Sequence, residues 1–356
     1  MRAVTAQTIP RVPRGRSLLV ALAAGVLVIA GLSWSRNLVV PVLVAAALVV
    51  IVYPVRTIVH RGTGVGALST AALIAACYSI LIAMAALLVF AATRFVQLIP
   101  EFSDDLEAAA RELSGFLETA GFDRGIAENA SGWLDPEAVL TVAGAVVEYL
   151  AQSATTLCLA LVFVFFLGVD SAHFRSIRSR FSRARRVELD ALVRLAADVR
   201  RYFAVNAVFG ALVAALDVVL LVILNVPGAA VWGVLAFVTN FIPNIGFVIG
   251  LILAMGFALL SGGWGTALLV AAGYCLVNVV LQVFVQPRFV GEAVHLSQTL
   301  AFGSVVFWSA VIGPFGAILA VPLTVAVRVA LLHRTDSDGW AWWLTGDRRE
   351  RETGGS

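Results

Sequence analysis

One acidic residue lies deep inside an apolar stretch of the chain. Asp217 occupies the middle of Ala204–Leu224, where most neighbours are aliphatic. An ionisable side chain within a membrane is costly, so it typically binds an ion or proton or pairs with polar groups. Asp217 is therefore a candidate coupling residue, and Asn206, three helical turns earlier on the same face, is a candidate to act with it. The alternative is a structural acid that faces a subunit interface or water.

A second set of polar side chains recurs at helical spacing. Asn278, Gln282 and Gln286 follow one another every four residues within a second apolar stretch. This spacing places the three amides on one face of a helix. Such a stripe either lines the path of a polar solute or joins neighbouring helices through hydrogen bonds. Both interpretations stay open at this stage.

The elements that must position these residues occur as two copies of one pattern. Each copy has an apolar segment and then a longer apolar segment that Pro and Gly interrupt. The first copy consists of Ala204–Leu224 and Ala229–Leu260, and the second consists of Thr266–Val285 and Thr299–Leu332. The interruptions fall at Pro243–Gly246 and at Gly313–Gly316.

The lengths of the interrupted segments favour helical hairpins over single spans. Arms of about 14 and 16 residues would be about 21–24 Å long, which is shorter than a hydrocarbon core of about 30 Å. Two such hairpins, entering from opposite faces, would form an inverted repeat with a solute site near the middle of the membrane. The alternative is a pair of long, kinked, tilted spans. The candidate solute-path residues at the tips are Thr239, Asn240, Pro243, Asn244, Gly246, Gly313, Pro314 and Gly316.

The composition fixes the broad class of the protein. Of 356 residues, 60% are apolar and 13% are charged, and the mean hydropathy is +0.95. These values predict an all-α polytopic membrane protein whose surface contacts the lipid bilayer. No catalytic constellation, metal-ligand spacing, nucleotide-binding motif or nucleic-acid patch occurs in the sequence. We therefore expect no enzyme activity, no metal, no cofactor and no nucleic-acid partner.

Charge placement predicts the order of the parts along the chain. Arginine-rich segments mark the cytoplasmic side of a membrane, so both termini are expected in the cytoplasm. With the broken segments counted either way, six to eight transmembrane segments are expected in the cytoplasmic membrane. The predicted parts are spans one to three in 1–99, an acidic insert in 100–137, span four in 138–169, an Arg-rich cytoplasmic helix in 170–202, the duplicated core in 203–332 and a cytoplasmic tail in 333–356.

The insert is expected on the external side of the membrane. It contains ten acidic residues and two arginines. Its apolar positions, among them Leu106 and Phe116, recur on one face of a predicted helix. We expect this face to pack against the protein itself or a neighbouring protomer, and the alternative is a simple solvated hairpin.

Three motifs in the core resemble those of the autoinducer-2 exporter family of permeases. They are Asn240–Gly246, Gln286–Gly291 and Gly313–Leu323. The resemblance extends over nearly the whole chain in the order of its spans. It implies efflux of small polar signals, sodium/proton exchange in some members, and homo-oligomers that include pentamers. Asn244 stands where an aromatic residue is common, and Asn206 stands where a basic or Gly-containing motif is frequent. Both departures bear on the substrate.

The leading hypothesis is a secondary-active exporter of small polar solutes or signalling molecules, driven by a proton or sodium gradient. Asp217 and Asn206 would serve the coupling ion, and the tips and the amide stripe would serve the solute. A monovalent cation/proton antiporter is the first alternative. The second is a membrane scaffold without transport activity, whose acidic insert binds envelope partners.

Overall fold

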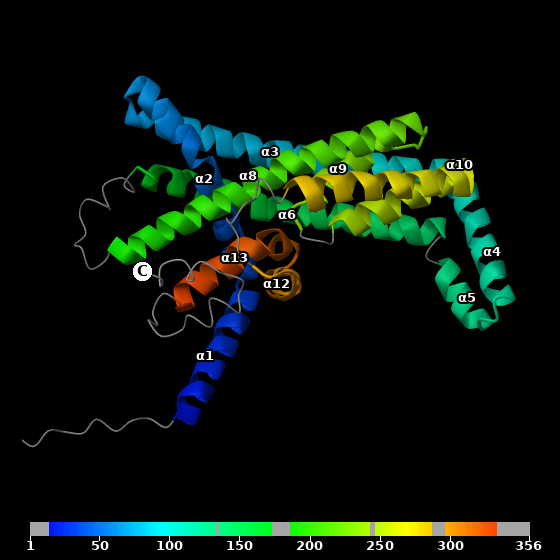
Figure 1. The fold of residues 1–356 in the computed structure, drawn as a ribbon, viewed down its shortest axis with the longest axis horizontal. Coiled ribbons are helices and arrows are strands. Elements are labelled where there is room, and N and C mark those ends of the chain that lie inside the picture. Colours follow the sequence, from blue (N-terminus) through cyan, green and yellow to red (C-terminus); the bar gives the residue numbers. More distant parts are fainter. Residues whose placement is uncertain (1–13, 133–134, 173–185, 243–245, 287–295, 333–356) are drawn as a thin grey trace, which may run out of the picture.

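A computed structural model describes residues 14–132, 135–172, 186–242, 246–286 and 296–332. Every regular element in these ranges is a helix, as the composition predicts (Figure 1). Five helical stretches are long and apolar enough to cross a membrane: 36–63, 66–119, 136–170, 189–223 and 246–285. The predicted first span falls in α1 (Arg14–Trp34), whose described apolar part, Ala23–Trp34, is one of four shorter apolar helices.

The N-terminal part is a bundle of α2 (Arg36–Thr63), α3 (Gly66–Leu98) and α6 (Pro136–Asp170). Helices suit the membrane because all of their backbone hydrogen bonds close within one segment. A shared apolar core that includes Val49, Leu73 and Val164 holds the three together. At one end, the buried Arg56 of α2 donates from Nη1 to the carbonyl oxygen of Ser171, at 3.1 Å.

The first broken segment folds as a helical hairpin. Its arms are α9 (Ala229–Thr239) and the first half of α10 (Gly246–Asn278). The arms run antiparallel, because Thr239 lies beside Gly246 at the tip, while Trp232 packs against Phe257 farther along. A Cβ atom on Gly246 would lie 2.0 Å from the carbonyl oxygen of Thr239, so this close reversal requires glycine.

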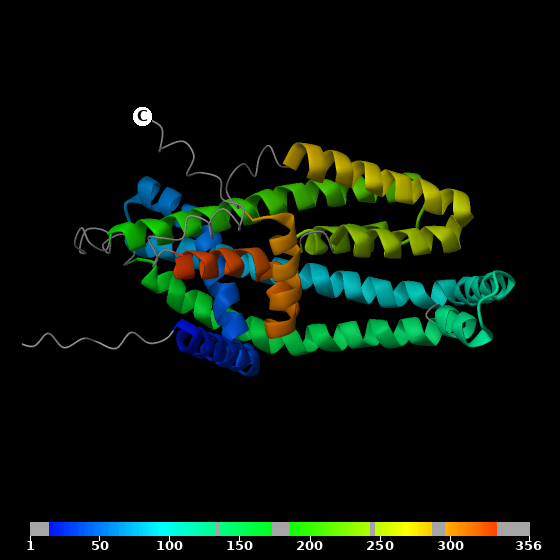
Figure 2. The same ribbon diagram turned by 60° about the horizontal axis from the view of Figure 1, so that its bottom comes forward.

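The helix α10 folds back a second time at Gly263. Together with the π-helical segment η4 (Val279–Val285), it forms a stretch of 40 residues. A straight helix of that length would measure roughly 60 Å, about twice the hydrocarbon core. Gly263 adopts φ 71° and ψ −172°, and the chain reverses there (Figure 2). This reversal lies in the predicted gap between Leu260 and Thr266.

The second broken segment is also a helical hairpin, built from α12 (Gln298–Ile312) and α13 (Pro314–Leu332). Gly313 joins the arms with φ 76°, in the left-handed region that glycine adopts readily. The Trp308 Nε1 atom donates to Thr324 Oγ1 across the arms, at 2.9 Å. Trp308 and its apolar neighbours on both arms form the common core of the hairpin.

The acidic insert consists of η1 (Ile99–Phe102), α4 (Ser103–Thr119) and α5 (Arg124–Ser131). It lies at one end of the bundle, whereas the α2–α3 turn and the arginine-bearing start of α8 (Arg186–Ile223) lie at the other (Figures 1 and 2). Leu106 is buried against α3, α6 and α10, while Phe116 is 68% exposed. The beginning of the predicted apolar face therefore packs on the bundle, and Leu113 and Leu117 farther along it are half-buried, whereas Phe116 is exposed.

The all-helical, polytopic class is thus confirmed, and the finer parts of the predicted fold stay predictions. Both broken segments reverse direction, but the depth of their tips in a membrane, the faces from which they enter and the inverted relation of the two copies are not tested. The predicted division of the chain into parts also stays a prediction. The helix α8 runs without interruption through the predicted boundary between 170–202 and 203–332, because apolar residues follow directly on its arginine-bearing first part.

Candidate functional site

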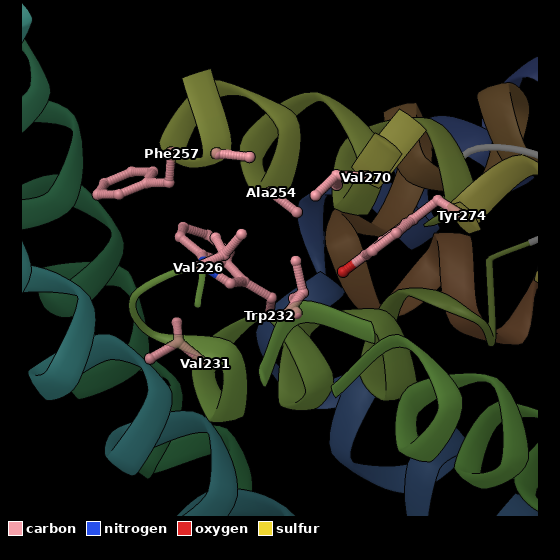
Figure 3. Packing of buried hydrophobic residues seen from close by; sticks show 9 residues of the cluster. Val226, Val231, Trp232, Ala254, Phe257, Val270 and Tyr274 are labelled. Carbon is pink, nitrogen blue, oxygen red and sulfur yellow. The ribbon is translucent and has the colours of Figure 1, made fainter. Parts of the chain in front are cut away.

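The predicted coupling residue lies where α8, α9 and α10 meet. Asp217 is 1% exposed, and neither of its carboxylate oxygens has a hydrogen-bond partner within the described ranges. It lines a small cavity that offers about 10 Å³ to the centre of a water molecule. Tyr274 of α10 lines the same cavity and is equally buried, and its hydroxyl group likewise has no hydrogen-bond partner among the residues that the structure describes. Its hydroxyl oxygen points away from α10, toward the green ribbons of α8 and α9 (Figure 3).

The predicted amide stripe forms hydrogen bonds with two other helices. Gln282 Nε2 donates to the Asn278 Oδ1 atom at 2.7 Å and to the Asn240 Oδ1 atom at 3.0 Å. Asn240 Nδ2 donates to the Asn206 carbonyl oxygen at 3.0 Å. Gln286 Nε2 donates to the Asn206 Oδ1 atom at 2.9 Å. These five residues, called the amide network below, link α8, the end of α9 and the η4 region.

An irregular helical segment positions the amide stripe next to the first tip. Residues 279–285 form a π-helix, which is wider than an α-helix and is frequent at functional sites. Gln282 sits in the middle of this segment and reaches both Asn240 and Asn278. The irregular turn therefore allows one side chain to join two helices.

The first tip is closed by side chain and backbone together. The Thr239 hydroxyl donates to the Leu235 carbonyl oxygen at 2.7 Å and lies 3.2 Å from the carbonyl oxygen of Gly246. The predicted path residues Thr239, Asn240 and Gly246 are thus brought together. Pro243 and Asn244, which were predicted with them, lie outside the described residues.

The second tip has different surroundings. Gly316 is buried, and a Cβ atom there would lie 2.1 Å from the Trp308 carbonyl oxygen. The apolar cluster of the second hairpin includes Ile242 of the first tip, so the end of the first hairpin packs against the second hairpin. The predicted polar role of Gly313, Pro314 and Gly316 has no support in these apolar contacts and stays a prediction.

Tyr274 is a site residue that the sequence analysis missed. It stands four residues before Asn278, so the same spacing that revealed the amide stripe continues to it. Its backbone carbonyl accepts from Asn278 Nδ2 at 2.8 Å, which ties it to the amide network. Tyr202 of α8 also reaches the first tip, where its hydroxyl donates to the Phe241 carbonyl oxygen at 3.5 Å.

Larger hollows lie away from these polar groups. A mostly apolar groove of about 570 Å³ lies on another side of α8 and α9, beside Leu87 of α3. A further hollow of about 400 Å³ lies near the outer end of α3, beside Arg94 and Glu101. The cavity at Asp217 is far smaller than either. In this conformation it has room for a water molecule or a small ion, but not for an organic solute.

Comparisons with known proteins identify relatives of the same length. Residues 19–335 match the model of the AI-2E transporter family. The AI-2 transport protein TqsA of Escherichia coli K12 is 29% identical over 89% of this chain and 92% of TqsA. YhhT of the same bacterium is 27% identical over 88% of this chain and 90% of YhhT. A protein of Haemophilus influenzae is 26% identical over 88% of this chain and 91% of its own length. The names of these relatives refer to transport.

Proposed function

The chain belongs to the AI-2E transporter family, and from this premise we propose that it exports small polar solutes or signalling molecules by secondary-active transport. The family and the apolar helices make it a multi-pass membrane transport protein rather than an enzyme. We place it in the cytoplasmic membrane with both termini in the cytoplasm. The proposed driving force is a proton or sodium gradient, and the proposed assembly is a homo-oligomer, with pentamers among the candidates.

The observation that carries this proposal is the unpaired, buried Asp217. An acidic side chain without a partner in a transporter's interior is costly, and proton or ion movement is the usual reason for its presence. Asp217 lies next to the amide network, since the cavity beside it is also lined by Asn240, Asn278 and Gln282. A change in the charge of Asp217 would therefore act on the side chains that contact the solute.

The amide network is the proposed solute path. Its members donate to and accept from one another, so a hydroxyl- or carbonyl-rich solute can replace these bonds as it enters. Entry requires a wider space than the cavity beside Asp217, so the first hairpin must move relative to α8. Movement of one repeat against the other around a central site is the usual route of alternating access.

Flux through reconstituted protein tests the proposal. AI-2 is the first solute to try, because the relative TqsA is named for its transport. Wild-type proteoliposomes should export it faster when a proton or sodium gradient is imposed. Asp217→Asn should lose this acceleration, while Glu148→Gln, which alters an exposed acid of α6, should keep it. Gradient-driven flux that persists in Asp217→Asn would remove Asp217 from the mechanism.

A monovalent cation/proton antiporter is the second candidate. The size of the cavity favours it, since only a water molecule or a small ion fits beside Asp217. Sodium-dependent proton movement in proteoliposomes without any organic solute would support this function. Proton movement that requires the organic solute would support export instead.

A further inference from the structure

Two buried polar groups share one small cavity and have no hydrogen-bond partner in the part of the chain that the structure describes. They are the carboxylate of Asp217 and the hydroxyl of Tyr274, each on a residue that is 1% exposed. Buried polar atoms are nearly always hydrogen-bonded to protein or to ordered water. Two exceptions at one place indicate that a further group belongs between them.

The dimensions of the cavity specify that group. It offers about 10 Å³, which is near the lower limit for a single water molecule. A buried water forms two to four hydrogen bonds, and here it finds two carboxylate oxygens and one hydroxyl. The facing amide oxygens of Asn240 and Asn278 already accept from Gln282 Nε2. The unsatisfied groups are therefore those of Asp217 and Tyr274.

We propose that Asp217, Tyr274 and one shared water molecule form the proton-loading site of the transporter, with Tyr274 as its specificity-determining residue. This inference rests on the proposed function and names the coupling ion at the same site. Loading adds one proton to the Asp217 carboxylate and makes the site neutral. Release returns that proton to water and restores the negative charge. The water carries the proton between the carboxylate and its exit, while the Tyr274 hydroxyl orients the water.

The supply of oxygen atoms favours a proton over sodium. Hard cations such as Ca²⁺ and Mg²⁺ take about six or more oxygen ligands. A sodium ion that sheds its water needs a comparably full shell. Among the buried side-chain oxygens that line the cavity in the described residues, three lack a hydrogen-bond partner, two from Asp217 and one from Tyr274. That number suits one water molecule and falls short of a cage for a bare cation.

The surroundings leave few other groups to titrate. The cavity is lined from α8, α9, α10 and η4, and its titratable members are Asp217 and Tyr274. The remaining lining is amide, aliphatic, aromatic or glycine. The amide network forms one wall, through Gln282 and its two acceptors. The Tyr274 carbonyl also accepts from Asn278, so a shift of Tyr274 on proton loading would move Asn278 and with it one end of the amide network.

Infrared difference spectroscopy on the full chain in liposomes tests this site. Wild-type protein should show the band of a buried neutral carboxyl group that appears reversibly as pH falls. Asp217→Asn should abolish the band. Tyr274→Phe should keep the band but reach half-loading at about tenfold lower proton concentration, because the charged form loses a hydrogen-bond donor that acts through the water.

Two further variants serve as control and as a second probe. Tyr78→Phe removes a hydroxyl that donates to the Leu161 carbonyl oxygen at 2.9 Å, far from Asp217 in sequence and in another helix pair. It should leave the titration unchanged. Gly250→Ala places a methyl group 4.0 Å from the Tyr274 ring and narrows the cavity without altering either polar group. It should shift the titration as Tyr274→Phe does, and thermal unfolding checks that each variant is folded.

The outcomes separate this inference from the proposed function. A titration in Tyr274→Phe that equals that of the wild type would overturn the shared site, even if Asp217→Asn abolishes gradient-driven flux. Loss of the band on adding sodium at constant pH would overturn the assignment to a proton. Gradient-driven flux that survives in Asp217→Asn would instead overturn the proposed function.

Discussion

The two helical hairpins share one backbone feature, a close approach of their arms at a glycine, but have different surroundings. In each, a buried glycine near the tip faces a carbonyl oxygen of the other arm, namely Thr239 opposite Gly246 and Trp308 opposite Gly316. The first tip lies in the amide network and next to the unpaired Asp217. The second tip lies in an apolar cluster that also holds Ile242 of the first.

The two hairpins therefore share the backbone shape of their tips but differ in the chemistry of the side chains around them. The glycines permit the tight approach of two arms, and this requirement is the same whatever lines the tip. The polar side chains come from the end of α9 in the first hairpin itself, and from α8 and the η4 region, which pack beside it. We infer that the first hairpin forms the moving wall of the proposed solute path, and that the second supports it through apolar contacts. Each prediction below compares matched changes in the two regions.

The largest effects are expected from the tip glycines. Gly246→Ala and Gly316→Ala each force a methyl group into a backbone carbonyl, which should destabilise the protein by about 1–3 kcal/mol or more. Gly256→Ala in α10 and Gly303→Ala in α12 are the matched controls, because an added Cβ meets nothing within 4 Å. Thermal unfolding in detergent measures all four. Equal stability of tip and control variants would contradict the shared backbone feature.

The next effect should distinguish the hairpins by function. Gln282→Leu breaks two side-chain bonds of the amide network and should lower solute flux about tenfold, since about 1.4 kcal/mol is a factor of ten. Thr324→Val removes the acceptor of Trp308 in the second hairpin. It should cost about 1 kcal/mol of stability but leave flux per folded protein within about twofold. Solute flux is measured per folded protein, with the folded fraction determined by gel filtration. A larger loss of flux in Thr324→Val than in Gln282→Leu would refute the division of roles between the two hairpins.

A smaller effect is expected at Asn206. Asn206→Ala removes the acceptor of Gln286 but keeps the backbone carbonyl that accepts from Asn240, so flux should fall only about threefold. Ser304→Ala is the comparison in α12, because this buried hydroxyl donates within its own helix, to the Ala301 carbonyl oxygen. It should change flux by less than about twofold. A loss at Ser304 as large as that at Asn206 would argue against the amide network as the solute path.

The smallest effect is expected from the acidic insert. Changing the exposed acids Asp104, Asp105 and Glu112 to amides leaves both hairpins untouched, so flux should stay within about twofold of wild type. A scaffold function predicts instead that these changes abolish the protein's activity in cells, because that activity would not depend on solute flux. Measuring flux and the cellular phenotype on the same variant distinguishes the two.

Local patterns in the sequence were sufficient to predict the helical class and to single out most of the polar residues that the candidate site brings together. Hydropathy located the long helices, and spacing located the amides, because both depend on residues near one another in the chain. The reversal at Gly263 was not predicted, although Gly262, Gly263 and Gly265 stand together in the sequence there. Membrane depth and the inverted relation of the copies depend on orientation in the bilayer, which these patterns do not determine.

Such local patterns could not predict contacts between segments that are distant in the sequence. Gln286 and Asn206 are 80 residues apart, and only the packing of α8 against η4 joins them. Tyr274 could have been found by extending the four-residue spacing by one step, but its importance comes from its position beside Asp217. The apolar environment of the second tip also arises from packing, since its Pro/Gly pattern resembles that of the first.

Thiol labelling of two equivalent alanines tests the central claim most directly. Ala236 of the first hairpin lines the cavity at Asp217, and Ala317 lies near the tip of the second, with 8% and 7% exposed. In a background without Cys77, Cys158 and Cys275, Ala236→Cys should react with a small water-soluble thiol reagent at a rate that solute and gradient change. Ala317→Cys should react at a rate that neither changes. Equal responses at the two positions, or a response at Ala317→Cys alone, would contradict a moving polar wall at the first hairpin.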